Sequence, residues 1–501
     1  MGGYGICYDW TTQDDCESLW GYWLPDSECE WAPCMRGNCC VEGECMQLFY
    51  EDCMAWGGEY TGPIFDGCDD PMFYCSNTIV VDASGGGDYL TIQEGIDAAN
   101  DTDTVLIRAG TYTGSGAASV PVVDLKGKAI RLAGDPKRAG KVYIDGQSQR
   151  ACIVCDSGET SETEIDLVEC INGSALEGGA LYCLSNPTIT NCVFRDSTAQ
   201  DAGGGVYIKG SQPTFIGCEF IGNESPYGGA IYMIDSSPVI TDGLIAQNSA
   251  SNRGGGLRMY RSSPVLTNVT IEGNWATRGG AAHIQENSVP VLESCMILNN
   301  TADSLGGGLV TNSNSPAIYR ECTFMGNRAT GDNGGQGSGG AIYSDTSACV
   351  VENCVIESNT ADVYGGGIYC WNSSPVITGT RISGNTSSAS GGGIRTIGGS
   401  GPSLDNDILC GNSPDNIGGP WDGAGDNCLA DNCQDNNGND MPDDCEDLYC
   451  EGDANGDSVV DINDLLAILD SWGSPDGDIT GDGQTTIDDI LIVLGNWGSC
   501  R

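Results

Sequence analysis

Basic side chains are scarce in this chain. Lys and Arg number 20 against 70 Asp and Glu, with a single His, and the formal net charge is −50. Such a charge repels polyanions and argues against nucleic acid binding. No apolar run is long enough to span a bilayer, so we expect no membrane span. The chain begins Met1-Gly2-Gly3-Tyr4 without an apolar leader, so we expect that a signal peptide was removed or is missing here.

Cysteine, by contrast, is abundant, with 27 residues. Residues 1–77 are rich in Cys and Trp, and their segments 14–21 and 51–58 align, which indicates a duplicated disulfide module. Its tryptophans form either a small core or a sugar-binding surface. Because disulfides persist outside the cell, we expect an extracellular or cell-surface location.

A nine-fold repeat occupies residues 178–412. Each copy has a Gly-Gly step, an apolar anchor, a turn that usually carries Ser-Pro, an apolar strand and an Asn. A period of 25–27 residues, lengthened to 33 by an insertion at 331–338, is typical of stacked units. Short strands without helical periodicity predict an all-β parallel β-helix, with about nine clear coils and about three less regular ones before them. The anchors are Leu181, Val206, Ile231, Leu257, Ala282, Leu309, Ile342, Ile368 and Ile394.

Two further apolar columns recur in step with the anchors, and we expect both to fill a dry core. The first is Ile189, Phe215, Ile240, Leu266, Leu292, Ile318, Val351, Ile377 and Leu404. The second is Phe194, Phe220, Ile245, Ile271, Ile297, Phe324, Ile356, Ile382 and Leu409. A cysteine column accompanies them, as buried thiols or as disulfides between coils: Cys192, Cys218, Cys295, Cys322 and Cys354.

The residues that follow the anchors should face solvent, because side chains alternate along a strand. They include many tyrosines and a group of basic residues. Stacked tyrosines and a solvated basic face explain this pattern, and the functional alternative is contact with a linear, anionic polysaccharide. On that alternative the glycan-binding candidates are Tyr207, Tyr232, Arg253, Arg258, Arg278, His283, Tyr369 and Trp371.

Three segments near the C-terminus have the ligand spacing of calcium loops, so Ca²⁺ is the predicted cofactor. The first comprises Asp453, Asn455, Asp457, Val459, Asp461 and Asp464, and the second Asp478, Thr480, Asp482, Gln484, Thr486 and Asp489. An apolar helix should follow each. The third comprises Asp435, Asn437, Asn439, Met441, Asp443 and Glu446. Its alternative is a linker held by disulfides of Cys428, Cys433, Cys445 and Cys450.

Several of these motifs resemble known families. The steps Gly228-Gly229-Ala230-Ile231 and Phe220-Ile221-Gly222-Asn223 resemble the repeats of polymorphic outer-membrane proteins, which form right-handed parallel β-helices. Residues 80–99 resemble the start of pectate-lyase-like and pectinesterase-like β-helices, where a short helix caps the open end. Thr91 and Glu94 have the spacing of a capping box. The Asp, Gln and Arg motifs of pectinesterase catalysis are missing, as is the autotransporter barrel of the first family.

The two paired calcium loops resemble a type I dockerin, and the third loop resembles thrombospondin type 3 segments. A dockerin implies a cohesin-like receptor as partner. The whole arrangement resembles secreted multimodular proteins of planctomycete-type bacteria.

The chain thus divides into a Cys/Trp-rich module (1–77), a capped β-helix (78–424), a Cys/Asp-rich linker (425–450) and a dockerin-like domain (451–501). We expect a secreted, calcium-binding protein for adhesion, carbohydrate contact or scaffolding. A polysaccharide lyase or glycoside hydrolase is the alternative, and a fibre-forming rod the second. The outward carboxylates Asp242, Asp345 and Asp405 do not stack, so catalysis is open but not favoured. An active site would lie in the early coils, among Asp124, Asp145, Glu162, Glu164 and Asp166.

Overall fold

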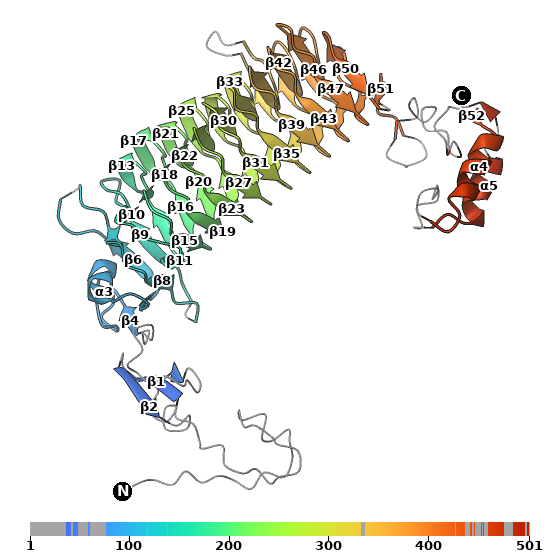
Figure 1. Ribbon diagram of the computed structural model, residues 1–501. Helices are drawn as coiled ribbons and strands as arrows, with labels where there is room; N and C mark the ends of the chain where they lie inside the picture. The colour runs from blue at the N-terminus through green and yellow to red at the C-terminus, as the bar shows by residue number, and fades with distance from the viewer. Residues whose placement is uncertain are drawn as a thin grey trace, which may run out of the picture.

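A parallel β-helix forms the middle of the chain, as the repeat predicts (Figure 1). The computed structural model describes residues 77–117, 119–137, 139–331, 336–425, 427–435, 441–442, 445, 452, 454, 459–474, 484–495 and 498–499, together with the backbone of strands at 37–41, 44–48 and 59–60.

Each regular coil contains four strands, whereas the repeat predicted two or three. In one central coil these are β22 (Ile231–Ile234), β23 (Val239–Thr241), β24 (Leu244–Ala246) and β25 (Ser249–Arg253). Each pairs in parallel with its equivalent in the next coil. The fourth strand lies between the repeat's Asn and its glycines, in a polar segment that the repeat did not mark as a strand.

Four parallel sheets result. The anchor sheet has 12 strands, from β7 (Val123–Asp124) to β49 (Ile417–Gly418). The second sheet has 14, from β4 (Thr78–Val81) to β50 (Asp422–Ala424), and the third has 13, from β6 (Gly110–Thr113) to β51 (Cys428–Ala430). The fourth strands form a nine-stranded cover sheet, from β13 (Ser174–Glu177) to β45 (Thr386–Ser387).

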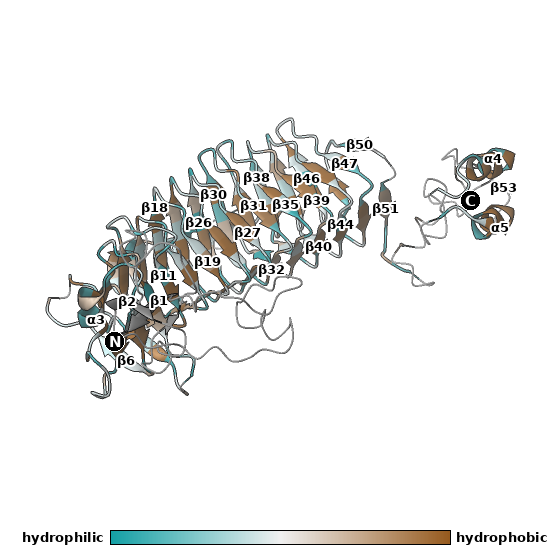
Figure 2. Cartoon of the chain, turned by 60° about the horizontal axis from the view of Figure 1, so that its bottom comes forward, coloured by the Kyte–Doolittle hydropathy of each residue, from teal (hydrophilic) through white to brown (hydrophobic). Residues whose placement is uncertain are grey.

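The interior of the coil is lined by the three predicted apolar columns. Hydrophobic residues concentrate on the strands (Figure 2). One assignment is wrong by a residue. Tyr319, not Ile318, pairs with Leu292 and is fully buried. The preceding turn contains two consecutive left-handed residues, Ser313 and Asn314, where most coils have one. The extra residue shifts the register by one position and so reverses which side chain points inward.

Polar ladders close the corners of the coil. Asn274 donates from Nδ2 to the carbonyl of Ile245 at 2.9 Å and to Oδ1 of Asn300 at 2.9 Å, and its own Oδ1 accepts the backbone N–H of Asn248. The equivalent Asn of neighbouring coils repeats this pattern. Each buried amide is therefore satisfied by the coils on both sides.

The cysteine column consists of buried free thiols, which decides between the two alternatives for those five residues. Each sulfur donates to a backbone carbonyl, as Cys192 does to Thr190 at 3.1 Å. Burial raises the pKa of Cys218 to about 12, so this thiol is neutral at physiological pH. These residues act as small core side chains.

A helix covers the first coil. Helix α3 (Ile92–Ala98) packs against β4 and β5 (Thr104–Ile107), and the predicted capping box of Thr91 and Glu94 is present. Gly95 faces β4, where an added Cβ would lie 2.6 Å from Val81. The cap shields a sheet edge that would otherwise be open to pairing.

The flanking modules are described in part. Strands β1 (Gly37–Val41), β2 (Glu44–Leu48) and β3 (Glu59–Tyr60) form an antiparallel sheet, and the remainder of the predicted disulfide module lies outside the described residues. At the other end, disulfides join Cys410 to Cys433 and Cys428 to Cys445. Helices α4 (Ile462–Asp470) and α5 (Ile487–Gly495) pack on each other through Val460, Ile468 and Val493.

Candidate functional site

The outer face of the anchor sheet is covered rather than open to solvent. Glycines follow the cover strands and turn the chain back toward the next anchor strand. Gly203 has a φ of +66°, and a Cβ there would lie 2.4 Å from the carbonyl oxygen of Val206 and 3.0 Å from the Cα of Tyr207. Only glycine allows the chain to pass so close to the strand that it enters.

The expected exposure of the column after the anchors is therefore wrong at several candidate positions. Tyr207 is 4% exposed, Arg258 3%, Tyr369 2% and His283 0%. These side chains do point away from the coil interior, as alternation predicts, but the cover sheet lies over them. Three other candidates, Tyr232, Arg253 and Arg278, are half-buried. Only Trp371, at 39%, is exposed.

The tyrosines of this column stack on one another. The rings of Tyr182, Tyr207 and Tyr232 lie parallel, with centroids 5.5 Å and 5.6 Å apart, and those of Tyr343 and Tyr369 are 5.1 Å apart. Tyrosines of neighbouring coils thus cover the ring faces on which a sugar would have to stack. Ladder stacking explains Tyr182, Tyr207, Tyr232 and Tyr343, whereas Tyr369 also borders a pocket.

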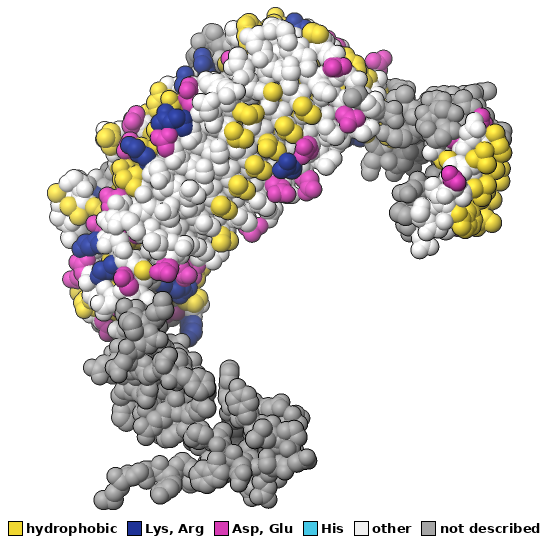
Figure 3. Space-filling model, in the orientation of Figure 1, with side chains coloured by type: hydrophobic (Ala, Val, Ile, Leu, Met, Phe, Trp, Pro, Cys, Tyr) yellow, Lys and Arg dark blue, Asp and Glu magenta, His cyan; other side chains and the backbone are white. Residues whose placement is uncertain are grey.

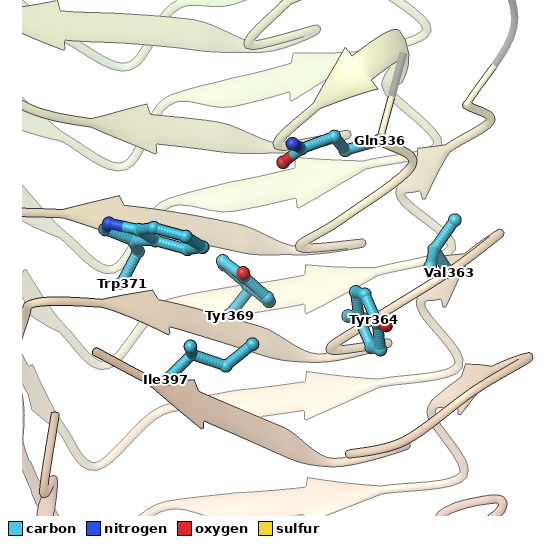
Figure 4. Close-up of a pocket in the computed structure, with 6 residues that line it drawn as sticks. All are labelled: Gln336, Val363, Tyr364, Tyr369, Trp371 and Ile397. Atoms are coloured by element: carbon cyan, nitrogen blue, oxygen red, sulfur yellow. The ribbon is translucent and has the colours of Figure 1, made fainter. Parts of the chain in front are cut away.

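A pocket of about 340 Å³ opens where the cover and anchor sheets diverge, near the insertion at 331–338. Tyr369 lies between Trp371 and Tyr364, and Gln336 and Ile397 lie on opposite sides of it along the rod (Figure 4). Tyr364 lies close to Tyr369, with ring centroids 6.3 Å apart. The pocket has aromatic walls and one amide.

Two glycan-binding candidates, Tyr369 and Trp371, therefore meet in one cavity. Sequence reasoning missed Gln336, Val363, Tyr364 and Ile397. Tyr364 occupies the same cover-sheet column as Arg253 and Arg278, just before the repeat's glycines, and Gln336 belongs to the insertion. The position of Tyr364 before the glycines and the insertion that contains Gln336 can both be seen in the sequence. The cover strand that brings the two residues together cannot.

The other candidates form a basic cluster in earlier coils. Arg258 on β26 (Leu257–Tyr260) and His283 on β30 (Ala282–Gln285) are register partners in the anchor sheet. Arg253 on β25 and Arg278 on β29 (Trp275–Arg278) are register partners in the cover sheet. Burial, followed by the charges of the three arginines, holds the pKa of His283 well below its usual value. Burial also lowers the pKa of Arg258 to about 10.

Of the acids named in the early coils, Asp145, Glu164 and Asp166 bond to arginine or polar side chains, and Asp124 accepts the backbone N–H of Lys126. Arg131 contacts Asp166 at 2.6 Å and Glu164 at 3.4 Å, and Asp166 also accepts a hydrogen bond from Thr190 at 2.8 Å. Asp145 accepts one from Asn172 at 3.1 Å. Within the described parts of the chain, no three His, Cys, Asp or Glu side chains gather as a metal site would require.

The calcium-loop candidates are described at the later loop positions. Asp464 accepts the N–H of Asp461, and Asp489 accepts that of Thr486, both at 2.7 Å, and both carboxylates are buried. The two loops thus place their last candidate ligand alike, and a carboxylate is the kind of ligand that Ca²⁺ prefers. Val459 and Gln484 are also described. Outside the described residues lie Asp453, Asn455, Asp457, Asp478, Thr480 and Asp482.

In the third loop only Asp435 and Met441 are described; Asn437, Asn439, Asp443 and Glu446 are not. The disulfide alternative for this segment has one unexpected pairing, because Cys433 bonds to Cys410 on β48 (Ile408–Cys410) of the rod. Calcium at this loop stays a prediction.

The two C-terminal helices expose apolar side chains in matching positions. On α4 these are Ile462, Leu466 and Leu469, and on α5 they are Ile487, Leu491 and Leu494. The same spacing recurs on both helices, and the apolar atoms are visible on the outer face of the pair in Figure 3. No helix among the described residues is long and apolar enough to cross a membrane.

A family model described as a right-handed β-helix region matches residues 204–387. The structure is similar to the A-module of a mannuronan C-5 epimerase of Azotobacter vinelandii, with 14% identity, a TM-score of 0.35, and coverage of 68% of this chain and 92% of that one.

It is also similar to a pectate lyase (12% identity, TM-score 0.31, 65% and 78% covered) and to an alginate lyase of polysaccharide lyase family 6 (11%, 0.40, 70% and 53%). No curated protein matches the chain. At these identities the likenesses concern the right-handed parallel β-helix alone.

Proposed function

We propose that this is a secreted protein that contacts a polysaccharide through the pocket between its anchor and cover sheets. The observation that carries the proposal is the aromatic lining of that pocket by Tyr364, Tyr369 and Trp371. Sugar rings present apolar faces that pack on aromatic rings, and an amide such as that of Gln336 can bond their hydroxyls. The exposed ring of Trp371 is the main contact.

The basic candidates extend this surface along the rod. Tyr232, Arg253 and Arg278 are half-buried and can reach a chain that lies over the seam between the two sheets. Tyr207, Arg258 and His283 lie beneath it and support the surface from below. The guanidinium groups would favour an acidic sugar over a neutral one.

The C-terminal pair supplies the anchor in this proposal. Calcium bound by the two loops holds α4 and α5 together, and the exposed apolar side chains of both helices bind a cohesin-like receptor. Six large apolar side chains at matching positions support a docking role, because soluble surfaces rarely expose contiguous apolar patches without a partner. Calcium at the Asp435 loop would stiffen the connection to the rod.

The test is a glycan array probed with the full chain and with Trp371→Ala. Loss of the ring should weaken binding at least about tenfold, which corresponds to about 1.4 kcal/mol. Trp275→Ala is the matched control, because Trp275 is 38% exposed, against 39% for Trp371, but lies in the cover sheet away from the pocket. Equal binding by all three proteins would refute the site.

An assay for reducing sugars and unsaturated products on the bound glycans tests the alternative that the protein is a polysaccharide lyase or glycoside hydrolase. Unsaturated ends would indicate a lyase, and new reducing ends without unsaturation a hydrolase. Binding without either product supports the contact role.

A further inference from the structure

The basic cluster contains donors that no protein group accepts. Arg258 donates from Nη1 to His283 Nδ1 at 2.7 Å and from Nη2 to Gln285 Oε1 at 2.6 Å. Arg253 reaches the same Gln285 oxygen at 3.3 Å. Because arginine can only donate, Nδ1 of the imidazole accepts, and its proton resides on Nε2. That Nε2, the Nε of Arg258 and the Nε of Arg253 are all buried without a partner.

No carboxylate neutralises this cluster. Other arginines of the rod have one, such as Arg261 with Asp235 at 2.7 Å and Arg320 with Glu352 at 2.6 Å. Among the described residues, no ion pair includes Arg253, Arg258 or Arg278.

The nearest acid in the network, Glu286, accepts from the amide of Gln285 at 3.2 Å rather than from a guanidinium. Arg258, the most buried arginine among the described residues, thus has no carboxylate partner in a chain with 70 acidic residues.

An unpaired buried charge is costly, since desolvation is not repaid by an opposite charge. The cost disappears if an anion occupies the cluster. The ligand must be small, because His283 is fully buried beneath the cover sheet and Arg258 nearly so. It must also accept hydrogen bonds and carry negative charge, because every unsatisfied group of these three side chains is a donor.

We propose that the seam between the anchor and cover sheets binds a small inorganic monoanion, of the size of chloride, among Arg253, Arg258, Arg278 and His283. This site differs from the aromatic pocket. His283 and Tyr369 are separated by three coils, which is about 14 Å at the usual strand spacing. The anion pins two cover strands to two anchor strands and so acts as an internal counterion.

The test is thermal unfolding of the full chain at constant pH, calcium and ionic strength, with gluconate replaced stepwise by chloride, bromide or nitrate. The β-helix transition should rise by about 2–4 °C as the site fills. Arg258→Met should lose this dependence. Arg261→Met is the matched control, because Arg261 is an exposed arginine with its own carboxylate partner, and it should keep the full shift.

Bromide-soaked crystals give a second readout that does not depend on a variant folding. An anomalous peak within hydrogen-bond distance of Nε2 of His283 or of Nε of Arg258 or Arg253 supports the site. Equal anion dependence of both variants, or no dependence in the native chain, would overturn it. So would stabilisation by uronate oligomers but not by chloride, because the cluster would then belong to the polysaccharide surface.

Discussion

The interior of the coil and the layer between the anchor and cover sheets are both buried, yet they are built differently. Ile245, Ile271 and their equivalents fill the interior, and its buried amides are bonded to neighbouring coils. The layer holds stacked tyrosines and unpaired basic groups such as Arg258 and His283. Apolar burial stabilises without needing a partner, whereas a buried cation needs one. The interior therefore supports the fold, and the layer is where we place ligands.

The largest effect should come from a charge inside the coil. Ile245→Asp would bury a carboxylate with no partner and should lower the free energy of unfolding by about 3–5 kcal/mol. Val239→Asp on the adjacent strand is the control, because that side chain is exposed, and it should change stability by no more than about 0.5 kcal/mol. Urea unfolding of the β-helix measures both. Similar losses for the two variants would mean that the inward and outward positions have been assigned wrongly.

The β-helix and the C-terminal helix pair should respond differently to the removal of calcium. Binding to the folded state alone stabilises it by about 2.7 kcal/mol when calcium is at a hundred times its dissociation constant. A chelator should therefore unfold α4 and α5 and leave the β-helix intact. Circular dichroism and limited proteolysis of residues 451–501, with magnesium as the control ion, measure this. Identical cleavage with and without chelator would contradict the loop assignment.

A change in the buried Asn ladder should lower the free energy of unfolding by less than a charge among the apolar columns. Asn274→Ala removes an amide that bonds to Ile245, Asn248 and Asn300, and leaves their groups unsatisfied. The expected loss is about 1–3 kcal/mol. Asn252→Ala is the control, because its half-buried amide on the cover sheet donates one bond, to the hydroxyl of Tyr227. The comparison fails if Asn252→Ala destabilises the rod as much.

The smallest effect should be a gain, not a loss, in the free energy of unfolding. In chloride-free buffer, Arg258→Met replaces an unpaired buried cation by an apolar side chain of similar length. We expect a gain of about 1 kcal/mol in the free energy of unfolding. Arg261→Met, which breaks an exposed ion pair, should change it by less than about 1 kcal/mol in the other direction. A marked loss on replacing Arg258 would show that its bonds to His283 and Gln285 already compensate its charge.

Alternation along the strands predicted correctly which side chains of most coils point inward. It was wrong at Ile318, because a turn with one extra left-handed residue moved Tyr319 into the core. It also assigned Tyr207 and Tyr369 to solvent, because alternation gives the side of a strand but not what lies beyond it. The polar composition of the cover strands, such as Ser249–Arg253, gave no signal of a sheet.

The amino-acid sequence by itself determined the period, the anchors, the capping helix and the inward ladders, because each follows from local spacing and from the need to bury apolar side chains. Only the tertiary structure decided that a fourth strand covers the anchor sheet, that Tyr364 meets Tyr369 and Trp371 in one pocket, and that Arg258 bonds to His283 without a carboxylate partner. Those contacts join residues of different strands and coils, and their distances depend on how the strands fold back on one another.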